Sequence, residues 1–260
     1  MSNANKYSRF RFARGPLASV YENEETRRPD FPLHEEMSKR RFPVRILRYW
    51  WLNLVIHEEA KKLGRPLTIV DVGSDRGTIK RLISPIDGAK WIGLDIDISR
   101  EGIELAKYDE LVKCDFDAGL ALPDGVADIV ICSHVLEHLP RPEFTMAEIN
   151  RIMKPGGMLL VGVPVKLKLF AKIREYQFGK QLKAGTRTKW QHVRVYWKKR
   201  LESLARSSGF EVEFSSGTAI IRKKGSRLED HAGWIRINQV FAALFPAMGQ
   251  EICMQLRKPE

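Results

Sequence analysis

The chain has 260 residues, of which 43% are hydrophobic and 9% aromatic, so it can bury a substantial core and is not disordered throughout. Its three cysteines lie far apart without CxxC spacing, which excludes a disulfide framework and a zinc knuckle and makes a reducing, cytoplasmic setting the expectation. The net charge of +12 is unevenly distributed along the chain. Residues 1–48 contain 11 basic and 6 acidic residues, residues 49–164 contain 13 and 18, and residues 165–260 contain 20 and 8. The strongly basic last third either attracts anionic partners or only keeps the surface solvated.

The first 42 residues show no sustained hydrophobic periodicity, and the stretch Arg27–Pro32 has two prolines that discourage a helix. Residues 1–42 are therefore predicted to form an irregular basic extension, without the apolar segment of a secretory signal. From Pro43 to Gly64, apolar residues recur at helical spacing. The most apolar run, Ile46–Ile56, is about half as long as a bilayer span, which predicts a buried helix and no transmembrane segment.

Between Leu67 and Pro164, short continuous apolar runs alternate with helical patterns. The predicted strands are 67–72, 90–95, 111–115, 127–133 and 157–164, and the predicted helices are 78–85, 99–107 and 142–153. Apolar strands separated by helices are typical of a parallel sheet that is covered on both faces. The pattern therefore predicts a doubly wound α/β fold.

After Pro164 the composition changes, because basic residues are interleaved with aromatic ones over residues 165–196. This segment is predicted to be a lid over the acceptor, with most of its aromatic side chains filling the lid's own core. Further along, the pattern predicts helices at 197–209 and 234–244 and strands at 210–216, 218–224 and 251–258.

The loop after the first predicted strand, "DVGSDRG", has an aspartate where a glycine-rich nucleotide loop would have its second glycine. Gly73 and Gly77 would let the backbone turn tightly and approach a ligand closely. Asp71 and Asp75 add negative charge where a pyrophosphate would need none. The loop therefore predicts a ligand with a cationic portion rather than a dinucleotide.

Polar residues also follow the next three strands, at the edge where a doubly wound sheet binds its ligand. Asp95 ends the second strand and is suited to accept the hydrogen bonds of a ribose diol. Asp115 would accept a hydrogen bond from an exocyclic amine, and Phe116 would form an apolar wall for a purine. His134 follows the fourth strand, at the mouth of the predicted site.

In this order, the segments "DVG…G", "WIGLD", "KCDF", "HVLEHL" and "RIMKPGG" resemble the class I S-adenosylmethionine-dependent methyltransferases, in particular the methyltransferase type 11 group. The resemblance is close over about residues 66–164 and looser to the end. It implies a doubly wound α/β fold with a seven-stranded, mostly parallel sheet and one antiparallel C-terminal strand. It also implies a methyltransferase domain over residues 43–260, with the lid at 165–196 inside it.

The resemblance implies S-adenosyl-L-methionine as the cofactor and assigns the contacts of each portion. The methionine portion would lie against the glycine loop, the ribose at the end of the second strand, the adenine after the third, and the sulfonium near the fourth. The residues so assigned are Asp71, Gly73, Gly77, Asp95, Ile96, Asp115, Phe116 and His134. Asp75 departs from the family, whose members usually have glycine there.

Methyl transfer to a hydroxyl needs a base, and histidine is the usual choice. His134 and His192 are the two candidate catalytic residues, whereas His138 lies one turn after His134 and more often packs or caps a helix. The spacing of His134, Glu137 and His138 also suits metal ligands, but the sequence supplies no clear further ligand. No metal is therefore assigned.

The predicted function is transfer of a methyl group to oxygen of a small-molecule, glycan or lipid-linked acceptor that carries negative charge. One rival is an RNA methyltransferase, which the basic, aromatic-rich final third would favour. A second rival is a protein that binds S-adenosylmethionine without catalysis, for which Asp75 is the main ground. The sequence leaves the oligomeric state open.

Overall fold

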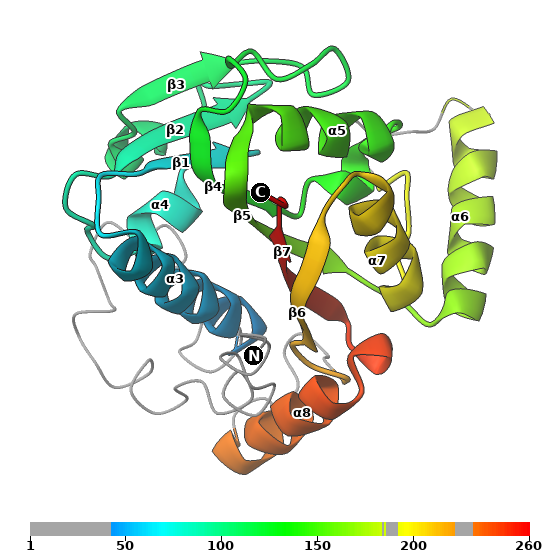
Figure 1. Ribbon diagram of the computed structural model, residues 1–260. Helices are drawn as coiled ribbons and strands as arrows, with labels where there is room; N and C mark the ends of the chain where they lie inside the picture. The colour runs from blue at the N-terminus through cyan, green and yellow to red at the C-terminus, as the bar shows by residue number, and fades with distance from the viewer. Residues whose placement is uncertain (1–42, 184, 186–191, 222–230) are drawn as a thin grey trace.

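The computed structural model describes residues 43–183, 185, 192–221 and 231–260, which form a seven-stranded sheet flanked by helices (Figure 1). The strand order is β3-β2-β1-β4-β5-β7-β6. Neighbouring strands are parallel except at β7, which runs antiparallel to both β5 and β6. The strands are Thr68–Val72 (β1), Lys90–Asp95 (β2), Glu110–Lys113 (β3), Ala127–Ser133 (β4), Met153–Pro164 (β5), Glu211–Gly217 (β6) and Glu251–Arg257 (β7). The predicted α/β fold class is confirmed.

The central strands are buried on both faces because helices cover both sides of the sheet. Helices α5 (Pro142–Ile152) and α7 (Lys198–Ser207) pack on one face, and α3 (Pro43–Leu63) packs on the other (Figure 1). Along β1, Val70 belongs to the core on the α5 side and Ile69 to the core on the α3 side, as the alternation of side chains in a strand requires. The continuous apolar runs in the sequence follow from this double cover.

The apolar run in α3 is explained by packing against the sheet. Its buried side chains recur at helical spacing and are Leu47, Trp51, Leu52, Val55 and Ile56. No helix among the described residues is long and apolar enough to cross a membrane.

Two predicted helices are shorter in the structure. Residues 78–85 form only α4 (Thr78–Leu82), and residues 99–107 form only the 3₁₀ turn η2 (Ile103–Ala106). Gly102 and Lys107, at the two ends of η2, both have left-handed backbone conformations, with φ of 88° and 51°. A right-handed helix cannot continue through either residue.

The predicted strand at 218–224 was wrong for its described part, because residues 218–221 form no strand and residues 222–224 lie outside the described residues. The backbone N–H groups of Ile220 and Ile221 both donate to Oδ1 of Asn238, at 2.8 and 3.0 Å. Asn238 belongs to α8 (Ala232–Leu244), which matches the predicted helix there. A side chain of α8 therefore satisfies these groups in place of a neighbouring strand.

A helix that the sequence did not predict, α6 (Lys168–Lys183), occupies much of the segment 165–196 and stands at the edge of the molecule (Figure 1). Part of that segment, residues 184 and 186–191, lies outside the described residues, as do residues 1–42. The division of the chain at residue 43 and the role of 165–196 as a lid stay predictions.

The packing of α3 on the sheet predicts a large loss of stability for Ile56→Ala. The side chain of Ile56 is fully buried, so its truncation leaves a cavity between helix and sheet, and we expect the free energy of unfolding to fall by about 2–5 kcal/mol. Urea denaturation measures this change. Lys61→Ala, at an exposed position of the same helix, should leave the midpoint almost unchanged; equal midpoints for the two variants would contradict the packing.

Candidate active site

The loop after β1 makes a tight turn against β2, and this turn requires glycine. The backbone N–H groups of Gly73 and Ser74 both donate to the carbonyl of Leu94 in β2, at 2.8 and 3.0 Å. Gly73 and Gly77 have φ of 81° and 70°, in the left-handed region. A Cβ on Gly73 would lie 2.3 Å from a methyl group of Val135, so no larger residue fits without movement.

Asp75 has a defined place in this loop. Its φ of 49° is a left-handed conformation that glycine adopts most easily and aspartate tolerates. Its backbone N–H donates to Oδ2 of Asp95 at 2.9 Å, and its exposed carboxylate forms an ion pair with Arg100. The side chain therefore points away from the loop's interior, and the backbone adopts the left-handed conformation that a glycine would adopt there.

Asp71 is the last residue but one of β1 and is 1% exposed. Tyr108 donates a hydrogen bond of 2.6 Å to its Oδ2, while Oδ1 is buried without a hydrogen-bond partner among the described residues. Burial raises the pKa of Asp71 to about 7, opposed by the Tyr108 hydrogen bond and reinforced by the neighbouring Asp95 and Asp75. A cationic ligand group next to Oδ1 would satisfy this carboxyl group and favour its ionised form.

Asp95 is buried at the end of β2, beside the glycine loop. Its Oδ1 accepts a hydrogen bond from the backbone of Asp97 at 3.1 Å, and its Oδ2 accepts the one from Asp75. These two hydrogen bonds fix the carboxylate in place. Because each oxygen has a second lone pair, the group can still accept hydrogen bonds from hydroxyls. Ile96, the next residue, is 42% exposed. The ribose contact of Asp95 and the cofactor contact of Ile96 stay predictions.

The two residues predicted to frame an adenine differ in burial. Asp115 is exposed, and its Oδ1 accepts a hydrogen bond from the backbone of Asp117 at 3.0 Å. Phe116 is buried in the core on the α5 side, and its carbonyl accepts a hydrogen bond from the Thr145 hydroxyl. Phe116 thus has a structural role in the core, and its contact with a purine stays a prediction.

His134 lies between two buried carboxylates. Its Nδ1 lies 3.3 Å from Oε1 of Glu137, and its Nε2 lies 3.3 Å from Oε1 of Glu251. Burial and the nearby Arg48 lower the pKa of His134, but Glu251 and Glu137 outweigh them, so the pKa stands above its usual value. Carboxylates facing both ring nitrogens favour the doubly protonated ring.

Glu251 and Arg48 were not identified from the sequence. Arg48 donates to both oxygens of Glu251, from Nε at 2.6 Å and from Nη2 at 2.9 Å; the Glu251 side chain is buried and that of Arg48 is only 11% exposed. Burial would raise the pKa of Glu251, but Arg48 and His134 outweigh it and lower the pKa to about 2. The available signal was an arginine inside the apolar run Ile46–Ile56, where a charge needs a buried partner.

The structure brings His192 to the same corner. Its ring meets that of His138 edge to face, with centroids 4.7 Å apart, and the backbone N–H groups of Val193 and Arg194 donate to the Glu137 carbonyl. Burial lowers the pKa of His192, and the nearby histidines add to this effect, while Glu137 opposes it. His192 therefore carries a neutral ring at neutral pH.

His192 also supplies the metal ligand that the sequence seemed to lack. One ligand atom each of Glu137, His138 and His192 lies within 4.8 Å of the others, a spacing that could hold an ion. The sequence did not indicate that His192 would join Glu137 and His138 in such a group. Grouping alone does not identify a metal site, and no metal is assigned.

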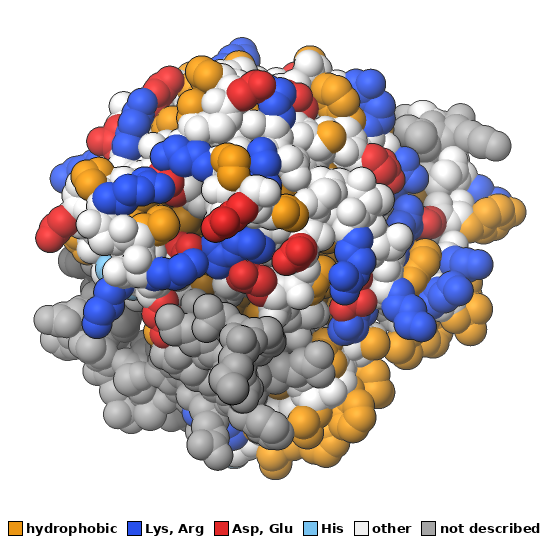
Figure 2. Space-filling view, in the orientation of Figure 1, with side chains coloured by type: hydrophobic (Ala, Val, Ile, Leu, Met, Phe, Trp, Pro, Cys, Tyr) orange, Lys and Arg blue, Asp and Glu red, His pale blue; other side chains and the backbone are white. Residues whose placement is uncertain are grey.

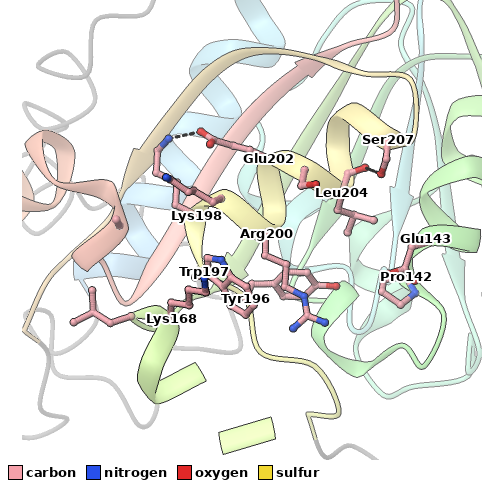
Figure 3. Close-up of a pocket in the computed structure, with 14 residues that line it drawn as sticks. Pro142, Glu143, Lys168, Tyr196, Trp197, Lys198, Arg200, Glu202, Leu204 and Ser207 are labelled. Atoms are coloured by element: carbon pink, nitrogen blue, oxygen red, sulfur yellow. Dashed lines mark hydrogen bonds and ion pairs between the residues drawn. The ribbon is translucent and has the colours of Figure 1, made fainter. Parts of the chain in front are cut away.

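A cavity of about 800 Å³ lies along α7, between the starts of α5 and α6 and the turn η5 (Pro246–Met248) (Figure 3). Arg200 lies over the rings of Tyr196 and Trp197 on its wall, 5.6 and 5.2 Å from their centroids. None of the site residues predicted above lines this cavity. The hydroxyl of Tyr196 donates to the Leu136 carbonyl, which links the cavity wall to the 3₁₀ turn Leu136–His138, just after His134.

Comparison with known proteins gives the family. The model of a family described as "Methyltransferase domain" matches residues 45–214, well over half of the chain. The chain belongs to this methyltransferase family. The predicted membership of the class I S-adenosylmethionine-dependent methyltransferases is thereby confirmed, together with the cofactor that this family uses.

Two curated relatives of this methyltransferase have the same name, ubiquinone biosynthesis O-methyltransferase. The protein from Paraburkholderia xenovorans (strain LB400) is 27% identical over 164 residues, which cover 60% of this chain and 64% of the relative. The protein from Thiobacillus denitrificans (strain ATCC 25259 / T1) is 28% identical over 199 residues, which cover 72% and 76%. The chain thus spans less than two thirds of the first relative.

Solved structures support the fold of the methyltransferase. A putative sarcosine dimethylglycine methyltransferase from Galdieria sulphuraria superposes with a TM-score of 0.56 at 14% identity, over 80% of this chain and 86% of that one. A putative methyltransferase from Bacillus halodurans gives 0.51 at 19% identity, over 78% and 98%. At these identities the likeness concerns the fold alone.

The crowding around Gly73 predicts that Gly73→Ala disrupts the loop. The new Cβ would meet Val135 and would require a left-handed alanine, at a cost of about 1–3 kcal/mol. We expect the affinity for S-adenosylhomocysteine, measured by calorimetry, to fall at least about tenfold. Gly179→Ala is the matched control, because a Cβ there has no neighbour within 4 Å. Unchanged affinity in Gly73→Ala would show that the loop does not hold the ligand.

Proposed function

We propose that the protein transfers a methyl group from S-adenosylmethionine to an oxygen of a small-molecule acceptor. The observation that carries this proposal is the pairing of two differently tuned histidines, His134 and His192, beside the glycine loop of a methyltransferase domain. The relatives named ubiquinone biosynthesis O-methyltransferase support an oxygen acceptor.

The residues around the glycine loop fit S-adenosylmethionine. Oδ1 of Asp71 is a buried polar atom without a partner in the described chain, as expected if a ligand's ammonium group completes it. A Cβ at Gly73 or Gly77 would collide with Val135 or Ala106, so only glycine lets the loop take this tight path beside Asp71. Asp71, Gly73 and Gly77 would hold the methionine portion, Asp95 and Ile96 the ribose, and Asp115 and Phe116 the adenine.

When bound, S-adenosylmethionine supplies a methyl group that its sulfonium already activates. The protein then has to hold the acceptor oxygen in line with this group and to remove its proton. Positioning alone supplies on the order of 7–11 kcal/mol in favourable cases. A base adds about 10²- to 10⁴-fold.

The base is assigned to His192 rather than His134. A base must have a free lone pair, and the lowered pKa of His192 leaves its ring neutral at neutral pH. His134 lies between Glu137 and Glu251, which favour its protonated form, so it has no free lone pair to take the proton of the acceptor. His192 would take the proton of the acceptor hydroxyl, and the resulting oxygen would bond to the methyl carbon as that carbon's bond to sulfur breaks, with S-adenosylhomocysteine as the other product.

The two alternative functions, a protein that binds S-adenosylmethionine without catalysis and an RNA methyltransferase, both lose support. The non-catalytic alternative rested on Asp75, whose side chain turns outward to Arg100 and whose backbone retains the loop conformation. The RNA alternative rested on the basic final third, and the relatives named above concern ubiquinone biosynthesis rather than RNA.

The raised pKa of Asp71 predicts pH-dependent cofactor binding. A ligand ammonium needs the ionised carboxylate, and the free protein protonates Asp71 below about pH 7, so affinity should fall by up to tenfold per pH unit below that value. Calorimetry with S-adenosylhomocysteine from about pH 6 to 8 measures this.

Asp71→Asn should bind weakly with little dependence on pH. Asp124→Asn, at an exposed aspartate, should keep the behaviour of the unaltered protein. A flat curve for the unaltered protein would remove Asp71 from the ammonium contact. Folded protein that binds neither S-adenosylmethionine nor S-adenosylhomocysteine would overturn the proposed function.

The assignment of His192 as the base predicts that His192→Ala lowers kcat about 10²- to 10⁴-fold without changing the affinity for S-adenosylhomocysteine. The assay uses anionic phenols such as 3,4-dihydroxybenzoate as acceptors, because their acidic hydroxyl matches the proposed chemistry. His138→Ala is the control for loss of ring packing, and a much smaller decrease is expected there. An equal decrease in both variants would reduce His192 to a structural residue.

A further inference from the structure

Helix α6 turns an apolar stripe away from the protein. Leu169, Ile173 and Tyr176 follow one another at spacings of four and three residues and therefore share one face. Leu169 and Tyr176 are 68% and 65% exposed. Ala171, which is fully buried, lies about 200° round the helix from both Leu169 and Ile173. The face of α6 that carries its large apolar side chains thus points to the outside.

Cations surround this stripe. The exposed ones are Lys168, Lys172, Arg174 and Lys180. Residues 165–183 contain six basic residues and one acidic residue, Glu175. Glu175 is turned toward the protein, where it accepts a hydrogen bond from the Val195 backbone at 3.1 Å and pairs with Arg200. The outward face of α6 is therefore both apolar and positively charged.

A second exposed apolar patch lies on α8 and η5. Its members are Ile237, Phe241, Leu244, Phe245 and Met248, each more than 40% exposed. The rings of Phe241 and Phe245 stack with centroids 6.3 Å apart. Gln239 and Ala242 of the same helix are buried on its other side. Residues 232–250 contain a single charged residue, Arg236, so this patch is almost purely apolar.

The two patches lie at the same end of the molecule. The backbone N–H of Val165, just before α6, donates to the Gln250 carbonyl at 2.9 Å, two residues after η5. Leu167 and Ala247 line the same cavity. Figure 2 shows hydrophobic side chains along the lower edge and, on the right, hydrophobic side chains mixed with Lys and Arg. The α6 stripe and the α8–η5 patch are together called the apolar rim.

We propose that the apolar rim docks on a lipid bilayer whose surface carries anionic lipids. An exposed surface that combines large apolar side chains with Lys and Arg suits an anionic membrane interface, because binding there grows with buried apolar area and with attraction to anionic lipids. Anionic head groups would neutralise the cations of α6, while acyl chains would receive Leu169, Ile173 and the α8–η5 patch.

Charge argues against a second copy of the chain as the partner. Two copies that met through the same surface would bring the Lys and Arg side chains of both α6 helices together, and like charges across an interface are unfavourable. The acidic residue that could balance them, Glu175, is already paired with Arg200 inside each chain. A bilayer surface supplies the opposite charge and the apolar phase at once.

Docking in this way would place the candidate active site at the membrane. The rim adjoins the ends of β5 and β7, and Glu251 at the start of β7 lies 3.3 Å from Nε2 of His134. An acceptor carried in the lipid phase would then reach the site without crossing water. This second step rests on the proposed function, whereas binding to the bilayer does not.

The test is flotation of the full chain with phosphatidylcholine vesicles, with and without phosphatidylglycerol. Binding is expected only when phosphatidylglycerol is present, and it should weaken as salt is added. Lys172→Gln with Lys180→Gln should lower the partition coefficient about 25-fold, since each surface cation contributes about fivefold. Leu169→Gln with Ile173→Gln should lower it at least tenfold.

Matched controls use exposed residues far from the rim. Leu105→Gln, on η2, replaces an apolar side chain that is 46% exposed, and Lys61→Gln with Lys113→Gln removes two exposed cations elsewhere. Both controls should bind vesicles as the unaltered protein does. Circular dichroism of every variant confirms that the fold is retained.

Absence of vesicle binding by the folded, unaltered chain would overturn the proposal, and so would equal losses in the rim variants and their controls. Sedimentation velocity tests the rival partner: a dimer that dissociates in the Leu169→Gln, Ile173→Gln variant would assign the rim to a second copy. Calorimetry with S-adenosylhomocysteine on the same preparation separates the two proposals. Vesicle binding without cofactor binding would contradict the proposed function alone, and the reverse result would contradict the docking alone.

Discussion

The buried ion pair between Arg48 and Glu251 joins two elements that lie 203 residues apart in sequence. Two charges taken out of water are stable only when they satisfy each other, and removing one partner of such a pair costs about 3–5 kcal/mol. Because Glu251 also faces His134, the pair fixes three elements relative to one another, namely α3, β4 and β7. The corner in which methyl transfer is proposed depends on this arrangement.

The glycine loop has the opposite electrostatic character. There Asp71, Asp75 and Asp95 lie close together, and Arg100 neutralises the outer side of the group while Asp71 stays buried behind it. Burial and the repulsion of Asp95 and Asp75 raise the pKa of Asp71 to about 7, so a bound cation would favour its ionised form. The two halves of the site therefore differ in their balance of charge. The half around Arg48, Glu251 and His134 pairs its own charges and is rigid, whereas the half around Asp71 has negative charge that a cationic ligand would neutralise.

Local patterns in the sequence were sufficient to predict the central strands of the sheet. The runs that became β1, β2, β4 and β5 are continuously apolar because helices cover both faces, and this pattern is visible without any knowledge of distant contacts. The loop residues Gly73 and Gly77 were found for the same reason, since their backbone geometry is a local requirement.

The features that the sequence did not predict depend on contacts between residues far apart in the chain or on which face of a helix is buried. No local pattern links Arg48 to Glu251, because the pair exists only after the two ends of the chain meet. Helix α6 was not predicted because its apolar residues lie on more than one face, with the buried Ala171 opposite the exposed Leu169 and Ile173, which obscures the usual helical periodicity. The capping of Ile220 and Ile221 by Asn238 likewise replaced a predicted strand by contacts with a distant helix.

The position of β7 has a consequence for biosynthesis. β7 lies between β5 and β6 although it follows both in sequence, so each of them has an open edge until residues 251–257 have left the ribosome. Pairing over such a long sequence separation is slow, and exposed strand edges favour aggregation in the meantime. Glu251 arrives with this same strand. The nascent chain can therefore assemble its glycine loop early, but it acquires the carboxylate that faces His134 only when the sheet closes.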